Sequence, residues 1–128
     1  MNSLYLTNRK DWRRWLAKNH QKKKEVWLIY YKRNSGKPSL SYDASVEEAL
    51  CYGWIDSRAK SINDQKFALR FTPRAKNSGW SKYNMARAFK MIQQRKMTRA
   101  GMAFCNMIFN EGILQFEFGH FTNKKIDL

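Results

Sequence analysis

Cysteine and histidine are scarce in this sequence, and their positions argue against a metal site. Cys51 and Cys105 are the only two cysteines; they form no Cys-x-x-Cys pair, and no histidine stands at zinc-ligand spacing. Both lie in apolar, helix-like surroundings, which predicts two buried free thiols in a reducing compartment; a single disulfide is the alternative. We therefore expect no metal and no cofactor.

Sequence signatures of catalysis and of membrane insertion are missing as well. His20 and His120 stand at opposite ends of the chain, and there is no Gly-x-Ser-x-Gly turn, P-loop or Gly-x-Gly-x-x-Gly. No carboxylate pair is spaced like an acid–base dyad, so we assign no catalytic residue. No apolar run approaches the roughly 18 residues of a membrane span, and the N-terminus has no signal-peptide core. A cytoplasmic protein without a transmembrane segment is expected.

Acidic residues are few, and the chain is strongly basic. Ten Asp and Glu stand against 25 Lys and Arg, which gives a formal charge of +15. Such a charge attracts anions, among them nucleic acid, acidic lipid surfaces and phosphorylated ligands. The alternative is a solvated lysine-rich surface without a binding role. Hydrophobic residues make up 43% of the 128 residues and aromatic residues 15%, so we expect a folded domain rather than a basic disordered tail.

The hydrophobic pattern predicts an α+β fold, with about four helices packed on a small, largely antiparallel sheet. We expect strands at 25–32, 54–61 and 66–72, the last two as a hairpin. The first strand is apolar on both faces, which predicts a central position. A single domain is expected over residues 1–112, followed by a divergent C-terminal tail at 113–128. In that tail Leu114, Phe116 and Phe118 alternate with other residues, as in a short strand or a segment laid on the surface.

Capping residues predict where the helices start. The expected N-caps are Thr7 or Asn8 for the first helix, Ser45 for the second, Ser81 for the third and Thr98 for the fourth. Glu48 stands three residues after Ser45 and completes a capping box, with Asp43 as an alternative, slightly earlier start. Gly53 is the expected stop of the second helix.

Polar groups set among aromatic residues predict an anion-binding concavity. Asp56 and Arg70 are expected to meet across the hairpin, so that the held guanidinium grips an anion. Donors at the start of the third helix add to it. The predicted ligand-binding residues are Trp54, Asp56, Ser57, Arg70, Thr72, Arg74, Trp80, Ser81 and Asn84, with Trp54 and Trp80 as walls. The alternative is an internal salt bridge and a capped turn that serve structure only.

The third predicted helix offers a second hypothesis, nucleic-acid binding. Basic residues interleave with its apolar stripe over 81–99: Lys82, Arg87, Lys90, Arg95, Lys96 and Arg99. Such a helix can rest on phosphates, although a solvated basic face is the alternative and no known nucleic-acid-binding motif is present. A third hypothesis is an enzyme acting on a small anionic substrate.

Several segments resemble one family of small bacterial proteins. They include Trp12–His20 (WRRWLAKNH), Lys24–Lys32 (KEVWLIYYK), Ser35–Pro38 (SGKP), Ser41-Tyr42, Val46–Ser57 (VEEALCYGWIDS), Arg70–Arg74 (RFTPR), Ser78–Asn84 (SGWSKYN) and Met97-Thr98. In order and spacing the chain resembles the bacteriocin-protection family, described as YdeI/OmpD-associated, over roughly residues 10–102; the family's usual C-terminal helical segment is missing. The resemblance implies a non-enzymatic role in tolerance to antimicrobial peptides or envelope stress, and its name implies association with a porin. Because a charge of +15 repels a cationic peptide, an indirect, cytoplasmic role is expected.

Overall fold

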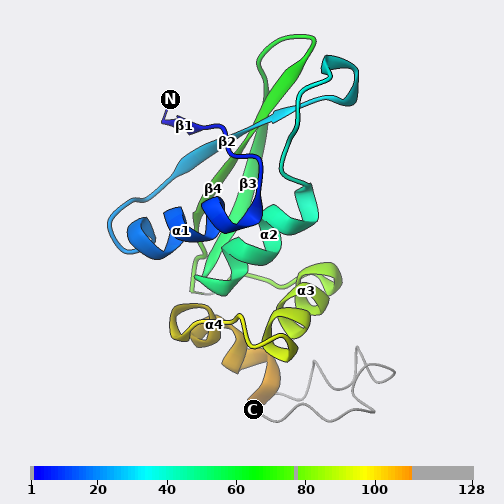
Figure 1. The fold of residues 1–128 in the computed structure, drawn as a ribbon. Helices are drawn as coiled ribbons and strands as arrows, with labels where there is room; N and C mark the ends of the chain where they lie inside the picture. Colours follow the sequence, from blue (N-terminus) through cyan, green and yellow to red (C-terminus); the bar gives the residue numbers. More distant parts are fainter. Residues whose placement is uncertain (1, 77, 111–128) are drawn as a thin grey trace.

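The computed structural model of the chain describes residues 2–76 and 78–110. The elements follow one another as β1 (Ser3–Leu4), α1 (Arg9–Asn19), β2 (Val26–Tyr31), a short 3-10 helix (Arg33–Ser35), α2 (Tyr42–Cys51), β3 (Trp54–Ser61), β4 (Lys66–Pro73), α3 (Lys82–Gln93) and α4 (Arg99–Asn110) (Figure 1). The predicted α+β fold is confirmed. The predicted tail and its extended segment at 114–118 lie outside the described residues.

The sheet has the strand order β1-β2-β4-β3. β2 and β4 are antiparallel, β3 and β4 form the predicted hairpin, and β1 runs parallel to β2. β2 therefore lies between two strands, which confirms its central position. β1 was not predicted because two residues are too short to show any periodicity.

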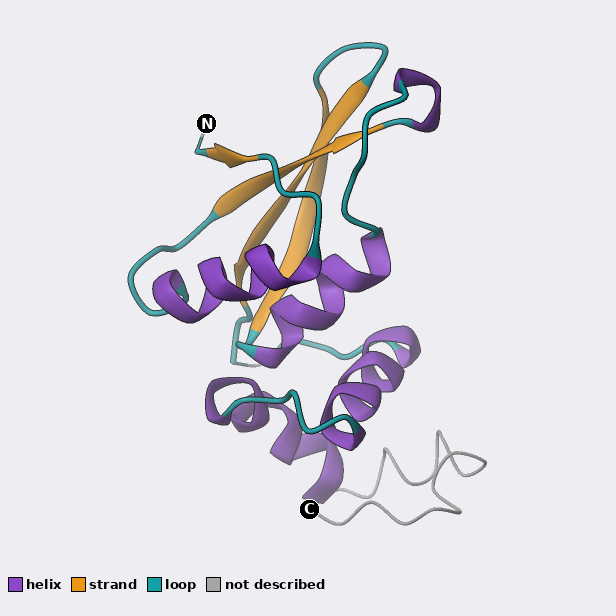
Figure 2. Cartoon of the chain, viewed as in Figure 1, coloured by secondary structure: helices purple, strands orange, loops and turns teal. Residues whose placement is uncertain are grey.

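Helices α1 and α2 cover one face of the sheet and build the core there (Figure 2). Leu28 of β2 lies opposite Leu69 of β4, and both pack with Trp12 and Leu16 of α1 in one buried cluster. Trp12 also donates its indole N–H to the carbonyl of Ser45 in α2, at 2.9 Å. One aromatic side chain thus joins α1 to α2 and to the sheet.

Helices α3 and α4 lie beyond the end of the sheet, and glycines let α4 approach closely (Figure 1). A Cβ on Gly101 would stand 2.5 Å from the carbonyl oxygens of Leu50 and Cys51, so only glycine fits between α4 and the end of α2. Gly53 has φ +75° in the turn from α2 to β3. Cys51 and Cys105 are both buried and free, as predicted.

The second helix starts four residues earlier than its predicted cap. Its N-cap is Ser41, whose hydroxyl accepts from the N–H of Ala44 at 3.1 Å. The predicted capping box of Ser45 and Glu48 is wrong: Ser45 lies buried inside the helix, where its hydroxyl accepts from Tyr30 and donates to the carbonyl of Ser41. The predicted caps Asn8 and Ser81 are confirmed.

Replacing Ser41 with alanine is expected to lower the free energy of unfolding by about 1 kcal/mol, because the first turn of α2 loses its side-chain acceptor. Urea denaturation measures this effect. Ser61→Ala is the matched control: Ser61 is exposed at the end of β3, and its loss should change stability by less than about 0.5 kcal/mol. Equal effects of the two substitutions would show that the hydroxyl of Ser41 does not cap α2.

Candidate anion-binding site

Arg74 is the first residue after β4, and the fold buries it. Its backbone N–H donates to the carbonyl of Gly53 at 2.8 Å, which fixes the end of β4 to the turn that precedes β3. Its side chain is among the few buried charged groups of the described residues, since only 6% of the residue is exposed. An arginine at this level of burial normally has a carboxylate partner.

The guanidinium of Arg74 is held by neutral groups of the loop that follows. Its Nη2 donates to the hydroxyl of Ser78 at 2.9 Å and to the carbonyl of Gly79 at 3.0 Å. Its central carbon lies 4.0 Å from the ring centroid of Trp80, in cation–π geometry. Its Nε is enclosed and has no hydrogen-bond partner among the described residues. The site therefore fixes the guanidinium in position and leaves one of its donors unused.

The positive charge of Arg74 is not neutralised by any described residue. None of the ion pairs among the described residues includes it. Burial lowers the pKa of Arg74, and of the described residues Cys105 acts in the opposite direction. Burial also raises the pKa of the Cys105 thiol to about 12, so this thiol is neutral at physiological pH. Arg74 stays protonated nonetheless, because guanidinium groups do not lose their proton in proteins.

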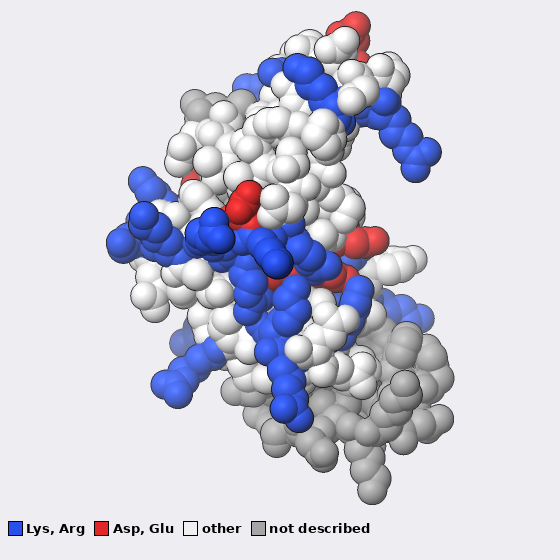
Figure 3. Space-filling model, viewed as in Figure 1, with Lys and Arg blue, Asp and Glu red and all other residues white. Residues whose placement is uncertain are grey.

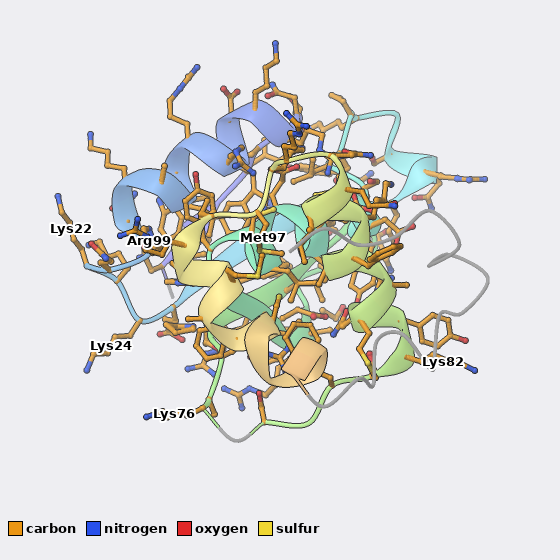
Figure 4. The ribbon with its side chains drawn as sticks, turned by 90° about the horizontal axis from the view of Figure 1, so that it is seen from below. Lys22, Lys24, Lys76, Lys82, Met97 and Arg99 are labelled. Atoms are coloured by element: carbon orange, nitrogen blue, oxygen red, sulfur yellow. The ribbon has the colours of Figure 1, made fainter. Side chains whose placement is uncertain are left out.

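Further cations lie on the flank of the molecule that includes the loop after Arg74. Lys76 projects outward from this loop, and Lys22 and Lys24 project from the same flank of the molecule (Figure 4). All three are exposed. Clustered charges of one sign raise the local concentration of oppositely charged ligands. This flank therefore attracts anions toward Arg74.

The predicted meeting of Asp56 and Arg70 does not occur. Asp56 lies opposite Phe71 on the face covered by helices, where it accepts from the hydroxyl of Tyr42 at 3.0 Å. Arg70 lies on the other face and pairs with Glu25. A β-bulge between Asp56 and Arg58 shifts the register of β3 against β4, so Asp56 pairs with Phe71 while Arg58 pairs with Arg70. Asp56 and Arg70 therefore lie on opposite faces of the sheet.

The residues predicted to form one concavity therefore lie in several separate parts of the structure. Arg74 and Trp80 come together as predicted, and Ser81 follows them as the cap of α3. Trp54 does not wall a site: it is buried in the core, where it contacts Trp15.

The other predicted ligand-binding residues lie apart from Arg74. Ser57 bonds to Arg70, Thr72 lies opposite Ile55, and Asn84 accepts from Arg87. The loop acceptors Ser78 and Gly79 were not predicted; their place just before Trp80 was the available signal. The candidate site thus consists of Arg74, Ser78, Gly79 and Trp80.

Three of the six basic residues predicted to bind nucleic acid form ion pairs with carboxylates of the same chain. Arg87 pairs with Asp43 at 2.7 Å, Lys90 with Glu47 at 3.0 Å, and Lys96 with Glu48. Figure 3 shows acidic side chains among the lysines and arginines of this face. Lys82, Arg95 and Arg99 remain exposed without an ion pair among the described residues. The carboxylates of α2 thus neutralise three of these six cations, which argues against a continuous phosphate-binding surface here.

One pocket of about 400 Å³ lies between α2 and α3, away from Arg74. Asp43 and Glu47 contribute carboxylates to its lining, and Tyr83 and Phe89 contribute rings. Arg87 and Lys90 also line the pocket, but each is paired with one of these carboxylates, so the described lining residues offer no unpaired cation comparable to Arg74. No helix among the described residues is long and apolar enough to cross a membrane.

The chain belongs to the family described as a domain of unknown function, DUF8412, whose model matches residues 4–104. The match includes all four residues of the candidate site. Neither the curated proteins nor the solved structures include a match to the chain. The description of the family assigns no function and does not link it to the bacteriocin-protection family, so that resemblance stays a prediction.

Proposed function

We propose that this chain is a non-enzymatic binding protein whose ligand is a small oxyanion bound at Arg74. The observation that carries the proposal is a buried guanidinium with no carboxylate partner among the described residues and with an unused Nε donor. Burying an ion without its counter-ion costs several kcal/mol. A cation–π contact returns about 2 kcal/mol when it is desolvated, so much of the cost is left to be offset.

An oxyanion offsets this cost in two ways. Its charge neutralises the guanidinium in surroundings where the attraction is stronger than in water. Its oxygen atoms accept charge-assisted hydrogen bonds, which are about twice as strong as neutral ones. Phosphate and sulfate have this chemistry. No general acid or base is needed for binding, and Cys105, the titratable group that acts on Arg74, is a neutral thiol.

Thermal unfolding in rising concentrations of sodium phosphate tests the proposal. The wild type is expected to gain stability as phosphate fills the site, following the ratio of free ligand to Kd. Arg74→Met keeps an unbranched apolar side chain but removes the charge, so its midpoint should not rise with phosphate. Without phosphate this variant should be as stable as the wild type or more so, because it no longer buries an unpaired ion. Sodium chloride at equal ionic strength controls for screening.

Arg14→Ala is the matched variant for general charge effects. Arg14 is exposed, and its one ion pair among the described residues is with Asp11 at 3.4 Å, so its loss should leave the response to phosphate intact. Two results would contradict the proposal. One is an equal rise of the midpoint in wild type and Arg74→Met. The other is a large loss of stability in Arg74→Met together with no phosphate response in the wild type, which would make Arg74 purely structural.

In the cell, we place this binding activity in tolerance to antimicrobial peptides or envelope stress. The support is the resemblance of the chain to the bacteriocin-protection family. The net charge of +15 favours an indirect role over capture of a cationic peptide, because like charges repel. Deleting the gene and scoring sensitivity to cationic peptides tests this role, with a plasmid carrying Arg74→Met as the critical complementation. If both the wild-type and the Arg74→Met plasmid restore resistance, the anion site has no part in it.

A further inference from the structure

A row of cationic side chains lies on the face of the sheet that α1 and α2 leave open. The cationic strip, as we call it, consists of Lys37, Arg58, Lys60, Lys66 and Arg70. Residues opposite one another in an antiparallel pair share a face. Leu28 and Leu69 are opposite each other on the core face, so their neighbours Trp27 and Arg70 lie on the open face. Arg58 lies opposite Arg70, and Lys60 opposite Ala68, on the same open face.

The hairpin carries the strip away from the helices. β3 and β4 extend beyond α1 and α2 in Figure 2, and β3 is exposed throughout 57–61. Arg58 and Lys60 point to the same side and stand about 7 Å apart along the strand. Helices α1 to α4 lie away from this end of the sheet, and only the short 3-10 helix Arg33–Ser35 lies near it (Figures 1 and 2).

Arg58 and Arg70 face each other directly across the hairpin. Like charges in this arrangement destabilise a sheet. Arg70 has Glu25 as a partner, but Arg58 forms no ion pair with any described residue. Of the two opposed guanidiniums only that of Arg70 has a carboxylate partner, so the charge of Arg58 is left unneutralised by the described residues.

Tyr31 brings two further cations together at the other end of the strip. The ammonium nitrogen of Lys37 lies 4.8 Å from the centroid of the Tyr31 ring, and that of Lys66 lies 5.5 Å away. Cation–π contacts hold such side chains in place while their charges stay available. The three paired strands β2, β3 and β4 contain one acidic residue, Asp56, and it lies on the opposite face. Apart from Glu25, which precedes β2 and pairs with Arg70, the charged residues on the open face of these strands are all cations.

We infer that the cationic strip binds single-stranded nucleic acid through its phosphates, without reading the base sequence. A polynucleotide backbone carries a regular line of negative charges, which complements an extended line of cations better than one isolated anion does. No helix of the described residues projects from this face to enter the groove of a duplex, whereas a positively charged surface with aromatic residues is typical of single-strand binding. The strip does not include Arg74, so the inference and the proposed function are independent.

Fluorescence anisotropy with a labelled 15-nucleotide oligo-dT and with oligo-U tests the inference on the full chain. The wild type is expected to bind both with micromolar Kd at about 0.1 M salt, and the affinity should fall steeply as salt is added. Arg58→Glu combined with Lys60→Glu should weaken binding at least tenfold. It should also reduce the salt slope by about 1.4, since each lost phosphate contact to a single strand removes about 0.7.

A second double variant controls for net charge. Lys10→Glu with Lys18→Glu lowers the net charge by the same amount on exposed positions of α1, and it should weaken binding less than threefold. The unfolding midpoint of the Arg58→Glu, Lys60→Glu variant should stay level or rise, because the carboxylate introduced at position 58 would face Arg70 with opposite charge. A loss of binding with intact stability thus separates the ligand surface from the fold.

Three outcomes would overturn the inference. The first is a wild type that does not bind either oligonucleotide at 50 mM salt. The second is equal weakening by the two double variants, which would reduce the effect to overall charge. The third is binding to vesicles of anionic phosphatidylserine that depends on Arg58 and Lys60 while oligonucleotide binding does not, which would assign the strip to a lipid surface.

Discussion

Replacing Glu48 with glutamine is expected to lower the free energy of unfolding by about 3 kcal/mol. The side chain of Glu48 is fully buried, and it accepts from Arg9 at 2.7 Å, from Arg13 at 2.9 Å and from Lys96. Breaking a buried ion pair costs about 3–5 kcal/mol because the remaining charges lose their partner. The lower end applies here, since the side chains of Arg13 and Lys96 are 29% and 28% exposed and water can reach them.

The pH dependence of stability distinguishes this effect from a packing defect. Burial alone would raise the pKa of Glu48, but hydrogen bonds from Lys96, Arg13 and Arg9 outweigh burial, and the pKa is lowered. A carboxyl group with a lowered pKa in the folded state stabilises the fold above its unfolded pKa of about 4.3, and this contribution is lost as pH falls through the folded pKa. Glu48→Gln lacks the ionisable group, so its stability should fall less than that of the wild type between pH 7 and pH 3.

Asp11→Asn provides the matched control, because it removes one carboxylate from an exposed pair. Asp11 and Arg14 are 45% and 79% exposed and stand 3.4 Å apart, so we expect a change below about 1 kcal/mol. Urea denaturation at several pH values measures both variants. A loss in Glu48→Gln as small as that in Asp11→Asn would mean that α1, α2 and the segment after α3 are not joined through this carboxylate.

The sequence predicted the elements of this fold better than their contacts. Alternating and β-branched residues marked β2, β3 and β4, because such patterns depend only on neighbouring positions. The pairing of Asp56 with Arg70 failed, because it required knowing which face each residue takes across the hairpin. A β-bulge between Asp56 and Arg58 places Asp56 opposite Phe71, so its carboxylate lies on the helix-covered face.

Ion pairs between residues far apart in the chain also could not be predicted from the sequence. Glu48 was predicted as part of a capping box because a serine stands three residues before it, which is a local pattern. Its true partners are as many as 48 residues away. The basic residues of α3 were predicted to face solvent for the same reason, since nothing local shows that Lys90 meets Glu47.

The candidate site has one feature that the local sequence predicted and one that depends on long-range packing. Arg74 and Trp80 were predicted from the mixture of arginine and aromatic residues in the segment after β4, and they do meet. That Arg74 is buried without a carboxylate partner among the described residues could not be predicted, because its burial depends on how the loop and distant elements pack around it. Gly53, whose carbonyl accepts a hydrogen bond from the backbone N–H of Arg74, is 21 residues earlier in the chain. Burial of a charged group is a tertiary property, and here it carries the functional proposal.

Replacing Trp12 with alanine is expected to have the largest effect, a loss of about 4 kcal/mol in the free energy of unfolding. Trp12 is fully buried, stacks on Trp15 with ring centroids 5.5 Å apart, and meets the edge of Phe71 at 5.3 Å. Truncating a buried tryptophan costs about 3–5 kcal/mol, because transfer energy is lost and a cavity remains. Total stability of a domain is about 5–15 kcal/mol, so this variant is close to unfolding.

Two further variants make the Trp12 result interpretable. Trp12→Phe keeps a large ring but removes the N–H that donates to the carbonyl of Ser45, so an intermediate loss of about 2 kcal/mol is expected. Tyr83→Ala removes an aromatic ring that is 75% exposed and should change stability by less than about 0.5 kcal/mol. Urea denaturation followed by circular dichroism ranks the three. If Trp12→Ala costs no more than Tyr83→Ala, α1 does not pack on the sheet through Trp12. If Trp12→Phe costs as much as Trp12→Ala, the hydrogen bond to α2 rather than the buried ring holds α1 in place.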